Sequence, residues 1–356
     1  MIATCEATAN IAVVKYWGKR DEKLVLPQNG SLSFTMDGQL KTRTSVMFSN
    51  KFKEDEFWLN GAKVDLKEKE VAERVVQLDL VRKKAGITDK ARIVSINCFP
   101  TAAGFASSAA GLAALACAAS KAAGLTLSDR ELSMLARRGS GSACRSVLGG
   151  FVEWRKGEKP DGSDSFAEQI APAAHWPELR NVIVVVDAGK KKVSSRAGMK
   201  QTVATSALYK ARMDYLPATI DAMKKAVLAK DFPTFAELTM RESSNMHAVM
   251  LDTTPPITYL NDWSKEIMHG VNALNAAAGK VVAGYTFDAG PNAHVYTLEK
   301  DVAAVRKMLE GVEGVRKVMV CRVGEGPKYL DKGHLLNADG SVREHSFVEG
   351  KGIVVK

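Results

Sequence analysis

Four short stretches of the sequence combine residue types that can bind phosphate or move a proton. The first, FPTAAGFASSAAG at 99–111, places Ser107 and Ser108 before a long Ala-rich run. Small residues let the backbone approach a ligand, and a helix that begins there aims free N–H groups and its positive dipole end at it. The pattern predicts a phosphate site, where a serine hydroxyl could also bind Mg²⁺. The alternative is a serine cap before a packed helix.

The second stretch, NIAVVKYWGKRD, gathers two lysines, an arginine and two aromatic residues at the end of an apolar run. These residues are Lys15, Tyr16, Trp17, Lys19 and Arg20. Cations and a phenol at one strand end can hold a diphosphate. The alternative is that the aromatic rings are half-buried core residues and the charges are only solvated.

The third stretch, RRGSGSACRS, has Ser140, Ser142 and Arg145 where a Gly-rich turn enters a helix. A guanidinium can bind a carboxylate or phosphate through two parallel hydrogen bonds, and the N–H groups of the turn can complete the site. An ordinary turn between two helices is the alternative.

The fourth stretch, YTFDAGPNAH, interrupts a β-like run with Asp288, Gly290 and Pro291. A carboxylate held at a strand end by a Gly-Pro turn can act as a general base toward a hydroxyl. Taken alone, the same residues also suit an ordinary turn.

Alternating strands and helices are expected to position these stretches. A helix that ends at 279, a capping box from Ser128 to Glu131 and a tight hairpin turn at Asn60-Gly61 are also expected. The predicted strands are 31–36, 41–48, 91–98, 151–155, 181–189, 281–290, 293–299 and 317–322. The predicted helices are 67–84, 107–124, 132–138, a long region at 197–250 interrupted at 231–233, and one from 301.

Length and composition indicate an ordinary globular protein of two domains. The chain has 356 residues, of which 46% are apolar and 25% charged, and we expect a domain boundary near 185–195, giving domains 1–188 and 189–356. No apolar run reaches the roughly 18 to 20 residues of a membrane span, so a soluble protein without a secretory signal is expected. Five scattered cysteines without CxxC spacing suggest a reducing, cytoplasmic compartment, and the dispersed histidines predict no transition-metal site.

The net charge of +10 favours anionic ligands. Nucleic acid is one candidate, but no zinc-finger, recognition-motif or basic-zipper pattern accompanies the charge. We therefore expect small polyanions as ligands, with neither nucleic acid nor a membrane as a partner.

Taken together, the four stretches resemble the mevalonate diphosphate decarboxylases, a branch of the GHMP small-molecule kinase superfamily. The resemblance includes the segments VSSRAGM and FAELTMRESSNMHAVMLDTTPPI, follows the order of the family and spans nearly the whole chain. KYWGKRD and GSGSACRS are specific to the decarboxylases, whereas the Gly/Ser phosphate loop is shared with the kinases.

The resemblance implies an α+β GHMP kinase fold, with an N-terminal half like domain 2 of ribosomal protein S5 and a ferredoxin-like C-terminal half around a deep cleft. It also implies a carboxy-lyase of isoprenoid and sterol biosynthesis, which acts as a cytoplasmic homodimer. Its expected reaction is the ATP-dependent, Mg²⁺-assisted decarboxylation of (R)-5-diphosphomevalonate to isopentenyl diphosphate, ADP, phosphate and CO₂.

By resemblance, Asp288 lies beside the tertiary hydroxyl of the substrate and assists its attack on the γ-phosphate of ATP. Lys15 keeps that carboxylate ionised, and Asn10 helps to orient the site. Arg145 binds the substrate carboxylate, and Ser108 is the critical serine of the phosphate loop. Trp17 or its apolar neighbours could form a wall beside the cation-like carbon, a role that we give as a hypothesis.

The remaining site residues implied by the resemblance fall into two groups. Those around diphosphomevalonate are Tyr16, Trp17, Gly18, Lys19, Ser140, Gly141, Ser142, Ala143, Cys144, Arg145, Ser195 and Arg196. Those at the ATP phosphates are Gly104, Phe105, Ala106, Ser107 and Ser108, with Mg²⁺ held through the phosphates and Ser107 or Ser108. The sequence departs from the family at Phe105, where Leu is usual, and Arg196 falls at a position that varies between Arg and Thr.

Two other functions stay open from the residues alone. A GHMP kinase that stops at phosphorylation would use the same serine loop and the same Asp288; only Arg145 within GSGSACRS and the KYWGKRD stretch favour decarboxylation. A nucleic-acid-binding protein could use the positive charge and an S5-like half, although no aromatic residues are interleaved on a basic face.

Overall fold

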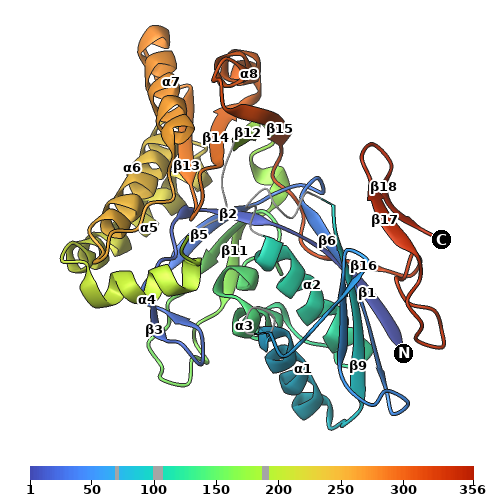
Figure 1. The fold of residues 1–356 in the computed structure, drawn as a ribbon. Coiled ribbons are helices and arrows are strands. Elements are labelled where there is room, and N and C mark those ends of the chain that lie inside the picture. The colour runs from blue at the N-terminus through green and yellow to red at the C-terminus, as the bar shows by residue number, and fades with distance from the viewer. Residues whose placement is uncertain (69–71, 99–106, 187–191) are drawn as a thin grey trace.

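The structure, a computed structural model, describes residues 1–68, 72–98, 107–186 and 192–356 (Figure 1). The side chains at 72, 73 and 107 lie outside this description. Three main sheets and the helices packed on them build this described part of the chain.

The first sheet has six strands in the order β16-β1-β6-β9-β7-β8, and only the β7–β9 pairing is parallel. Its strands are β1 (Ile2–Thr8), β6 (Lys41–Ser49), β7 (Glu56–Leu59), β8 (Ala62–Val64), β9 (Lys90–Asn97) and β16 (Lys328–Leu330). Asn60 and Gly61 both have positive φ, 51° and 85°, which confirms the predicted tight turn between β7 and β8.

Three helices pack against the first sheet (Figure 1). They are α1 (Ala72–Ala85), α2 (Ser107–Ala122) and α3 (Asp129–Gly139). The alanines of α2 are buried against β1 and β6, because a helix with small side chains can approach a sheet closely. Ser128 and Glu131 form the predicted capping box at the start of α3. Residues near the C-terminus cover β9 from the other side, together with the hairpin of β17 (His345–Val348) and β18 (Gly352–Val355).

The second sheet is antiparallel, has the order β11-β10-β5-β2 and lies in the middle of the molecule (Figure 1). Its strands are β2 (Asn10–Val14), β5 (Ser31–Thr35), β10 (Phe151–Trp154) and β11 (Ala167–Ala171). Every residue of β2 and β5 is buried. A small ribbon of β3 (Lys19–Asp21) and β4 (Leu26–Pro27) extends from it, and the 3₁₀ turns η2 (Gly141–Cys144) and η3 (Ala173–His175) flank β10 and β11.

The third sheet is antiparallel and has the order β13-β14-β12-β15. Its strands are β12 (Leu179–Val186), β13 (Ala283–Phe287), β14 (Ala293–Leu298) and β15 (Val315–Cys321). Its helices are α4 (Ser195–Thr205), α5 (Tyr209–Ala229), α6 (Phe232–Leu251), α7 (Asp262–Ala278) and α8 (Val302–Glu310), which follows η4 (Glu299–Asp301). The strand order within this βαββαβ arrangement is ferredoxin-like, so the expected α+β fold is confirmed.

Alternation along β12 divides its side chains between two cores. Val182 and Val184 pack with α7 and α8, whereas Ile183 packs with α5 and α6. Successive side chains of a strand point to opposite faces, so helices cover both faces of the third sheet. The pair α5 and α6 also packs on the second sheet, which joins the two halves of the chain.

The prediction of a single interruption in the helical region 197–250 was wrong. The break at Asp231 is present, with Asp231 capping α6, but a second break separates α4 from α5 at 206–208. Asp252 explains this break, because its carboxylate accepts hydrogen bonds from the Ser206 hydroxyl at 2.7 Å and from the Leu208 N–H at 2.9 Å. These bonds favour a turn over a continuous helix.

The division into domains 1–188 and 189–356 stays a prediction. Strand pairing crosses that point in two places. β12, which precedes it, pairs with β14 and β15, and β16, which follows it, returns to pair with β1 in the first sheet.

Candidate active site

An ion pair between Lys15 and Asp288 joins the central sheet to the third sheet. Lys15 directly follows β2, and Asp288 directly follows β13, which ends at Phe287 and is therefore shorter than the predicted strand. Lys15 Nζ donates to Asp288 Oδ1 at 2.6 Å. The Lys15 side chain is only 1% exposed, whereas the Asp288 side chain is 43% exposed. The buried cation thus fixes a carboxylate that an incoming molecule can reach.

The charges around Asp288 keep it ionised. Desolvation alone would raise the pKa of Asp288, but the positive charges of Lys15 and Arg145 lower it below its ordinary value. Burial lowers the pKa of Lys15, and the negative charge of Asp288 opposes that effect. An ionised carboxylate beside an ammonium group can accept a hydrogen bond from a hydroxyl and take its proton.

Arg145 lies within electrostatic reach of Asp288 and is held rigidly. Its Nε donates to Asn10 Oδ1 at 3.1 Å and its Nη1 to Ser31 Oγ at 2.5 Å. The guanidinium lies over the Trp154 ring, 5.9 Å from the centroid, and the residue is 2% exposed. Among the described residues no carboxylate forms a salt bridge with Arg145, so its charge is available to an anionic ligand.

Asn10 connects Arg145 to the turn that follows α3. Its Nδ2 donates to the Ser142 carbonyl at 3.0 Å and to Ser146 Oγ at 2.7 Å, while its Oδ1 accepts from Arg145. The second stretch and the third stretch of the sequence therefore meet at this amide.

The turn at 140–144 offers backbone groups and two serines. Ser140 Oγ and Ser142 Oγ lie 3.2 Å apart, and both residues are partly exposed. Ala143 and Cys144 are buried in the core, so their side chains cannot reach a ligand from outside. A Cβ at Gly141 would lie 2.7 Å from the Tyr16 ring, which explains why glycine is needed there.

Tyr16, Trp17 and Gly18 are packed against the helices of the C-terminal half. Tyr16 packs on Trp154 with ring centroids 4.8 Å apart, and its buried hydroxyl has no hydrogen-bond partner among the residues that the structure describes. Trp17 is 3% exposed. Gly18 has a φ of +102°, and a Cβ there would lie 2.0 Å from the Tyr209 hydroxyl, which donates to the Trp17 carbonyl at 2.6 Å.

Arg196 brings a further cation to the turn at 140–144, and Lys19 stands in the ribbon that follows Gly18. Lys19 Nζ lies 2.5 Å from Glu22 Oε2 and its side chain is 6% exposed. Arg196, in the first turn of α4 after the partly exposed Ser195, donates to the Gly139 carbonyl at 3.3 Å. Arg196 thus reaches from α4 to the end of α3, next to Ser140.

The expected ATP-phosphate residues are only partly described. Gly104, Phe105 and Ala106, and the side chain of Ser107, lie outside the described residues. Ser108 is exposed in the first turn of α2, a helix of 16 residues. The N-terminus of such a helix suits a phosphate, and an exposed hydroxyl suits a phosphate oxygen or Mg²⁺, so this part fits the expected ligands.

A fully buried ion pair, which the sequence analysis did not predict, lies next to Lys15. Arg212 of α5 and Glu242 of α6 approach to 2.5 Å, and both side chains are 0% exposed. Arg212 Nη2 also donates to the Lys15 carbonyl at 3.3 Å. The sequence pattern around Arg212 and Glu242 does not indicate this pair, because a charge on a helix is most often solvated and the two positions lie thirty residues apart.

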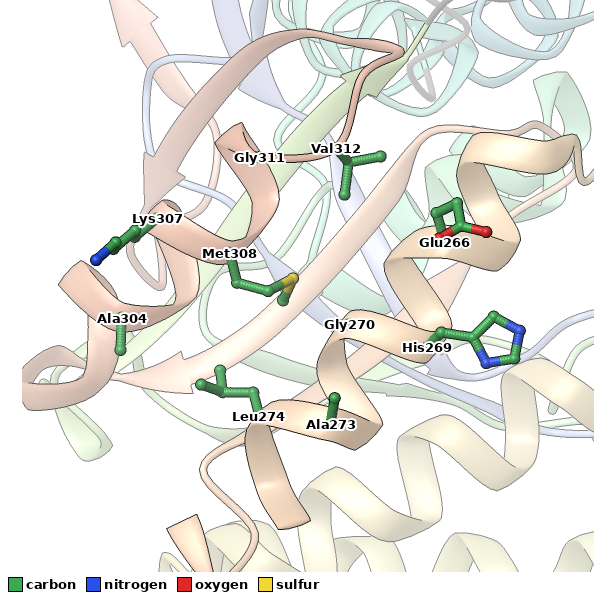
Figure 2. A pocket seen from close by; sticks show the side chains of 10 residues that line it. All are labelled: Glu266, His269, Gly270, Ala273, Leu274, Ala304, Lys307, Met308, Gly311 and Val312. Atoms are coloured by element: carbon green, nitrogen blue, oxygen red, sulfur yellow. The ribbon is translucent and has the colours of Figure 1, made fainter. Parts of the chain in front are cut away.

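A groove between α7 and α8, with a volume of about 710 Å³, lies in a different part of the chain (Figure 2). Met308, Leu274 and Val312 line its floor, and Glu266 and Lys307 lie on opposite sides of it. None of the expected site residues within the described ranges lines this groove, and we assign it no role in the chemistry.

The described residues show neither a cluster of metal ligands nor a helix that could cross a membrane. No group of three or more His, Cys, Asp or Glu side chains there is arranged to hold a metal ion. None of the helices in the described ranges combines the length and the apolar character that a bilayer crossing requires.

Comparison with known proteins gives matches over most of the chain. The family model of the diphosphomevalonate decarboxylase-like N-terminal domain matches residues 7–167, and that of the mevalonate 5-diphosphate decarboxylase C-terminal domain matches residues 181–313. The diphosphomevalonate decarboxylase of Aspergillus fumigatus is 48% identical, with 96% of each chain covered.

Solved structures agree with these matches. Mevalonate diphosphate decarboxylase from Trypanosoma brucei superposes with a TM-score of 0.86 at 36% identity, covering 93% of this chain and 98% of that one. A structure described as MDDEF in complex with MVAPP, AMPPCP and magnesium gives 0.85 at 40% identity, covering 93% and 99%. Identity of this extent over nearly the full length of both chains leaves one conclusion: the chain belongs to the diphosphomevalonate decarboxylase family.

Proposed function

We propose that this protein catalyses the ATP-dependent decarboxylation of (R)-5-diphosphomevalonate to isopentenyl diphosphate, with ADP, phosphate and CO₂ as the other products. Membership of the family supports the reaction. The observation that carries the proposal is the exposed Asp288 carboxylate, bonded to the buried Lys15 and within electrostatic reach of Arg145. The Asp288 carboxylate can accept a proton from an alcohol, while the Arg145 guanidinium binds the acid group of the same small molecule.

Asp288 acts on the tertiary hydroxyl. A β-hydroxy acid loses CO₂ readily only when its hydroxyl has become a good leaving group, and phosphorylation supplies one. Asp288 accepts the hydroxyl proton as the oxygen attacks the γ-phosphorus of ATP, and the O–P bond forms as the bond to ADP breaks. Lys15 favours the ionised form of Asp288 before the transfer.

Arg145 holds the substrate carboxylate. Two of its nitrogens already donate to Asn10 and Ser31, so the plane of the guanidinium is fixed before substrate arrives. Loss of phosphate then leaves positive character on the tertiary carbon. As CO₂ leaves, the electrons of the bond that joined it to the adjacent carbon form a double bond between that carbon and the tertiary carbon.

The diphosphate of the substrate is proposed to lie at Tyr16, Gly18 and Lys19 and at the turn after α3, near Arg196. The partly exposed serines of that turn and the Arg196 guanidinium, which already touches the Gly139 carbonyl, support this placement. Trp17, which is 3% exposed, or its apolar neighbours would form a wall beside the cation-like carbon.

ATP and Mg²⁺ are proposed as the cosubstrate and the cofactor. The description of the MDDEF complex, with an ATP analogue and magnesium, supports both. Ser108 would contact a phosphate or the metal at the start of α2. Mg²⁺ would neutralise charge that develops on the transferring phosphoryl group.

A direct assay separates this function from that of a kinase. Purified protein given ATP, Mg²⁺ and diphosphomevalonate is expected to release CO₂ and phosphate in equal amounts, with one ADP for each. Release of ADP without CO₂ would instead show a kinase that stops at phosphorylation. A steeply salt-dependent affinity for RNA that survives Asp288→Asn would favour the nucleic-acid alternative.

We also propose that the protein is a cytoplasmic homodimer that serves isoprenoid and sterol biosynthesis. Light scattering on the purified protein tests the dimer, and a molar mass of one chain over the micromolar range would exclude it. Fractionation of the source cells tests the compartment.

A further inference from the structure

The position of Lys15 depends on contacts to its backbone as well as on its ammonium group. Its carbonyl accepts from Asn29 Nδ2 at 2.9 Å and from Arg212 Nη2 at 3.3 Å. Arg212 in turn is fixed by Glu242 at 2.5 Å and by Asn245 Oδ1 at 2.6 Å. Glu242 and Asn245 both belong to α6, so one helix controls the lysine through a single arginine.

The same helix also holds the other partner of the pair. Ser243, which follows Glu242, accepts a hydrogen bond from the Phe287 N–H at 2.9 Å, and it is 1% exposed. His247 lies one turn further along, with its ring 6.4 Å from the Phe287 ring, and interacts with the backbone of Phe287 and Asp288. Residues four apart in a helix share a face, so Ser243 and His247 together hold the end of β13.

The Arg212–Glu242 pair is not explained by stability. Removing two charges from water costs free energy that their attraction only partly returns, and apolar residues of similar volume often serve as well or better. A fully buried pair at this place therefore calls for another role. Its contact with the Lys15 carbonyl supplies one.

We propose that the segment Glu242–His247 of α6 positions both partners of the Lys15–Asp288 ion pair, with Glu242 acting through Arg212 on Lys15 and Ser243 acting through the backbone on Asp288. These are positioning residues, because none of them is expected to touch the substrate. The proposal rests on the proposed function in one respect only, namely that turnover depends on Asp288.

The charges that face Lys15 predict how the pH dependence of turnover should change when Glu242 is replaced. Asp288 and Glu242 raise the pKa of Lys15, Arg145 lowers it, and Arg212 approaches its carbonyl. His294 and His247 complete the surroundings, and burial favours their neutral forms. Removing the charge of Glu242 therefore lowers the pKa of Lys15. The alkaline limb of the pH–rate profile, where Lys15 loses its proton, is expected to move to lower pH.

The decisive variant removes the buried pair without leaving an unpaired charge. Arg212→Met with Glu242→Leu is expected to keep or raise the melting temperature, since it replaces two buried charges by apolar side chains. Its kcat is nevertheless expected to fall about tenfold or more, because the Lys15 carbonyl loses one of its two donors. The KM for ATP is expected to stay within twofold. A folded double variant with at least half the kcat of the unaltered protein overturns the proposal.

Glu242→Gln tests the charge itself. The alkaline limb of kcat is expected to move down by about half a pH unit or more. Asp55→Asn is the control at a distant site, since it removes one carboxylate partner of the largely buried Arg82 in the N-terminal half, where Arg82 keeps its second pair with Asp79. An alkaline limb that stays in place, or that moves equally in the control, contradicts the role of Glu242. If the single variant fails to fold, the double variant alone decides.

Neighbouring serines test the half of the proposal that concerns Asp288. Ser243→Ala removes the acceptor of the Phe287 N–H, and we expect about a tenfold loss of kcat with an unchanged KM for ATP. Ser244→Ala is the control, because Ser244 is exposed and only approaches the Tyr285 hydroxyl at 3.5 Å. Equal activity of the two variants would contradict the assignment. Both ADP and CO₂ are measured, so that ADP release without CO₂ from the unaltered protein rejects the decarboxylase function while the positioning test still stands.

Discussion

Lys15–Asp288 and Arg212–Glu242 are two ion pairs connected through the Lys15 carbonyl, and they differ in their access to solvent. Asp288 keeps 43% of its side chain exposed beside a lysine that is 1% exposed. Both partners of the second pair are 0% exposed. The carboxylate of the first pair can meet a substrate, whereas that of the second can act only through its neighbours.

The two cations differ as well. A buried lysine can give up its proton when its partner is lost, while an arginine stays charged. Lysine beside the reactive carboxylate therefore tolerates a change of charge during turnover, and arginine in the closed pair gives a fixed charge and fixed geometry. The difference suggests that the open pair is the place of the chemistry and that the closed pair supports it.

The largest effect is expected on turnover when the open pair loses its carboxylate. Asp288→Asn and Asp288→Ala should lower kcat by between about 10² and 10⁴, which is the usual contribution of a positioned proton acceptor. Steady-state kinetics with near-native circular dichroism would show this. A variant that keeps most of its activity would show that Asp288 is not the proton acceptor.

The free energy of unfolding is expected to depend more on the closed pair, Arg212–Glu242, than on the open pair, which is the reverse of the order expected for turnover. Glu242→Gln leaves a buried arginine without its partner and should cost about 3 to 5 kcal/mol in the free energy of unfolding. Asp288→Asn should cost less than half as much, because Lys15 can become neutral and the carboxylate was already partly hydrated. Urea unfolding of both variants measures the difference. Equal losses would contradict this account of the two cations.

Arg145 extends the comparison to a second buried arginine, at 2% exposure. Arg212 has a carboxylate partner, but Arg145 has none among the residues described. Arg145→Lys is expected to lower kcat/KM by roughly 10- to 100-fold, since a point charge cannot reproduce a two-pronged contact with a carboxylate. Its melting temperature should change little compared with that of Arg212→Lys. A larger loss of stability than of activity would assign Arg145 to the core.

The sequence allowed the elements of the site to be predicted better than their supports. Lys15, Arg145 and Asp288 stand in motifs of unusual composition at the ends of strands or turns, so a local pattern makes them candidates. Arg212 and Glu242 stand in ordinary helical surroundings, and only the packing of α5 on α6 shows that both are buried. Ser31, which accepts a hydrogen bond from Arg145, lies in a buried strand whose sequence pattern indicates a core strand and no site residue.

The fold shows the same limit. Strongly periodic helices, the capping box at Ser128 and the Asn60-Gly61 turn depend on near neighbours in the chain, and all three are present as predicted. The break at 206–208 depends on Asp252, more than forty residues away, and β16 pairs with a strand at the other end of the chain. Contacts between such distant segments leave no local signal.

The smallest effect concerns a histidine beside the open pair. His294, 3% exposed, has its pKa lowered to about 4 because burial disfavours the charged ring. The unfolded chain, with an ordinary pKa near 6.5, binds the proton more readily between about pH 4 and pH 6.5. Stability is therefore complete above about pH 6.5 and is lost on acidification, with a slope of about 1.4 kcal/mol per pH unit from this residue. Asn181 Nδ2 lies 3.2 Å from His294 Nδ1 and donates to the neutral ring, which adds to the preference for the neutral form.

His294→Asn should flatten the dependence of unfolding free energy on pH by about that slope, whereas His269→Asn, at an exposed position, should leave it unchanged. Urea unfolding between pH 4 and 7 measures both slopes, and the same slope in the His294 variant as in the unaltered protein would show that this ring is not held neutral.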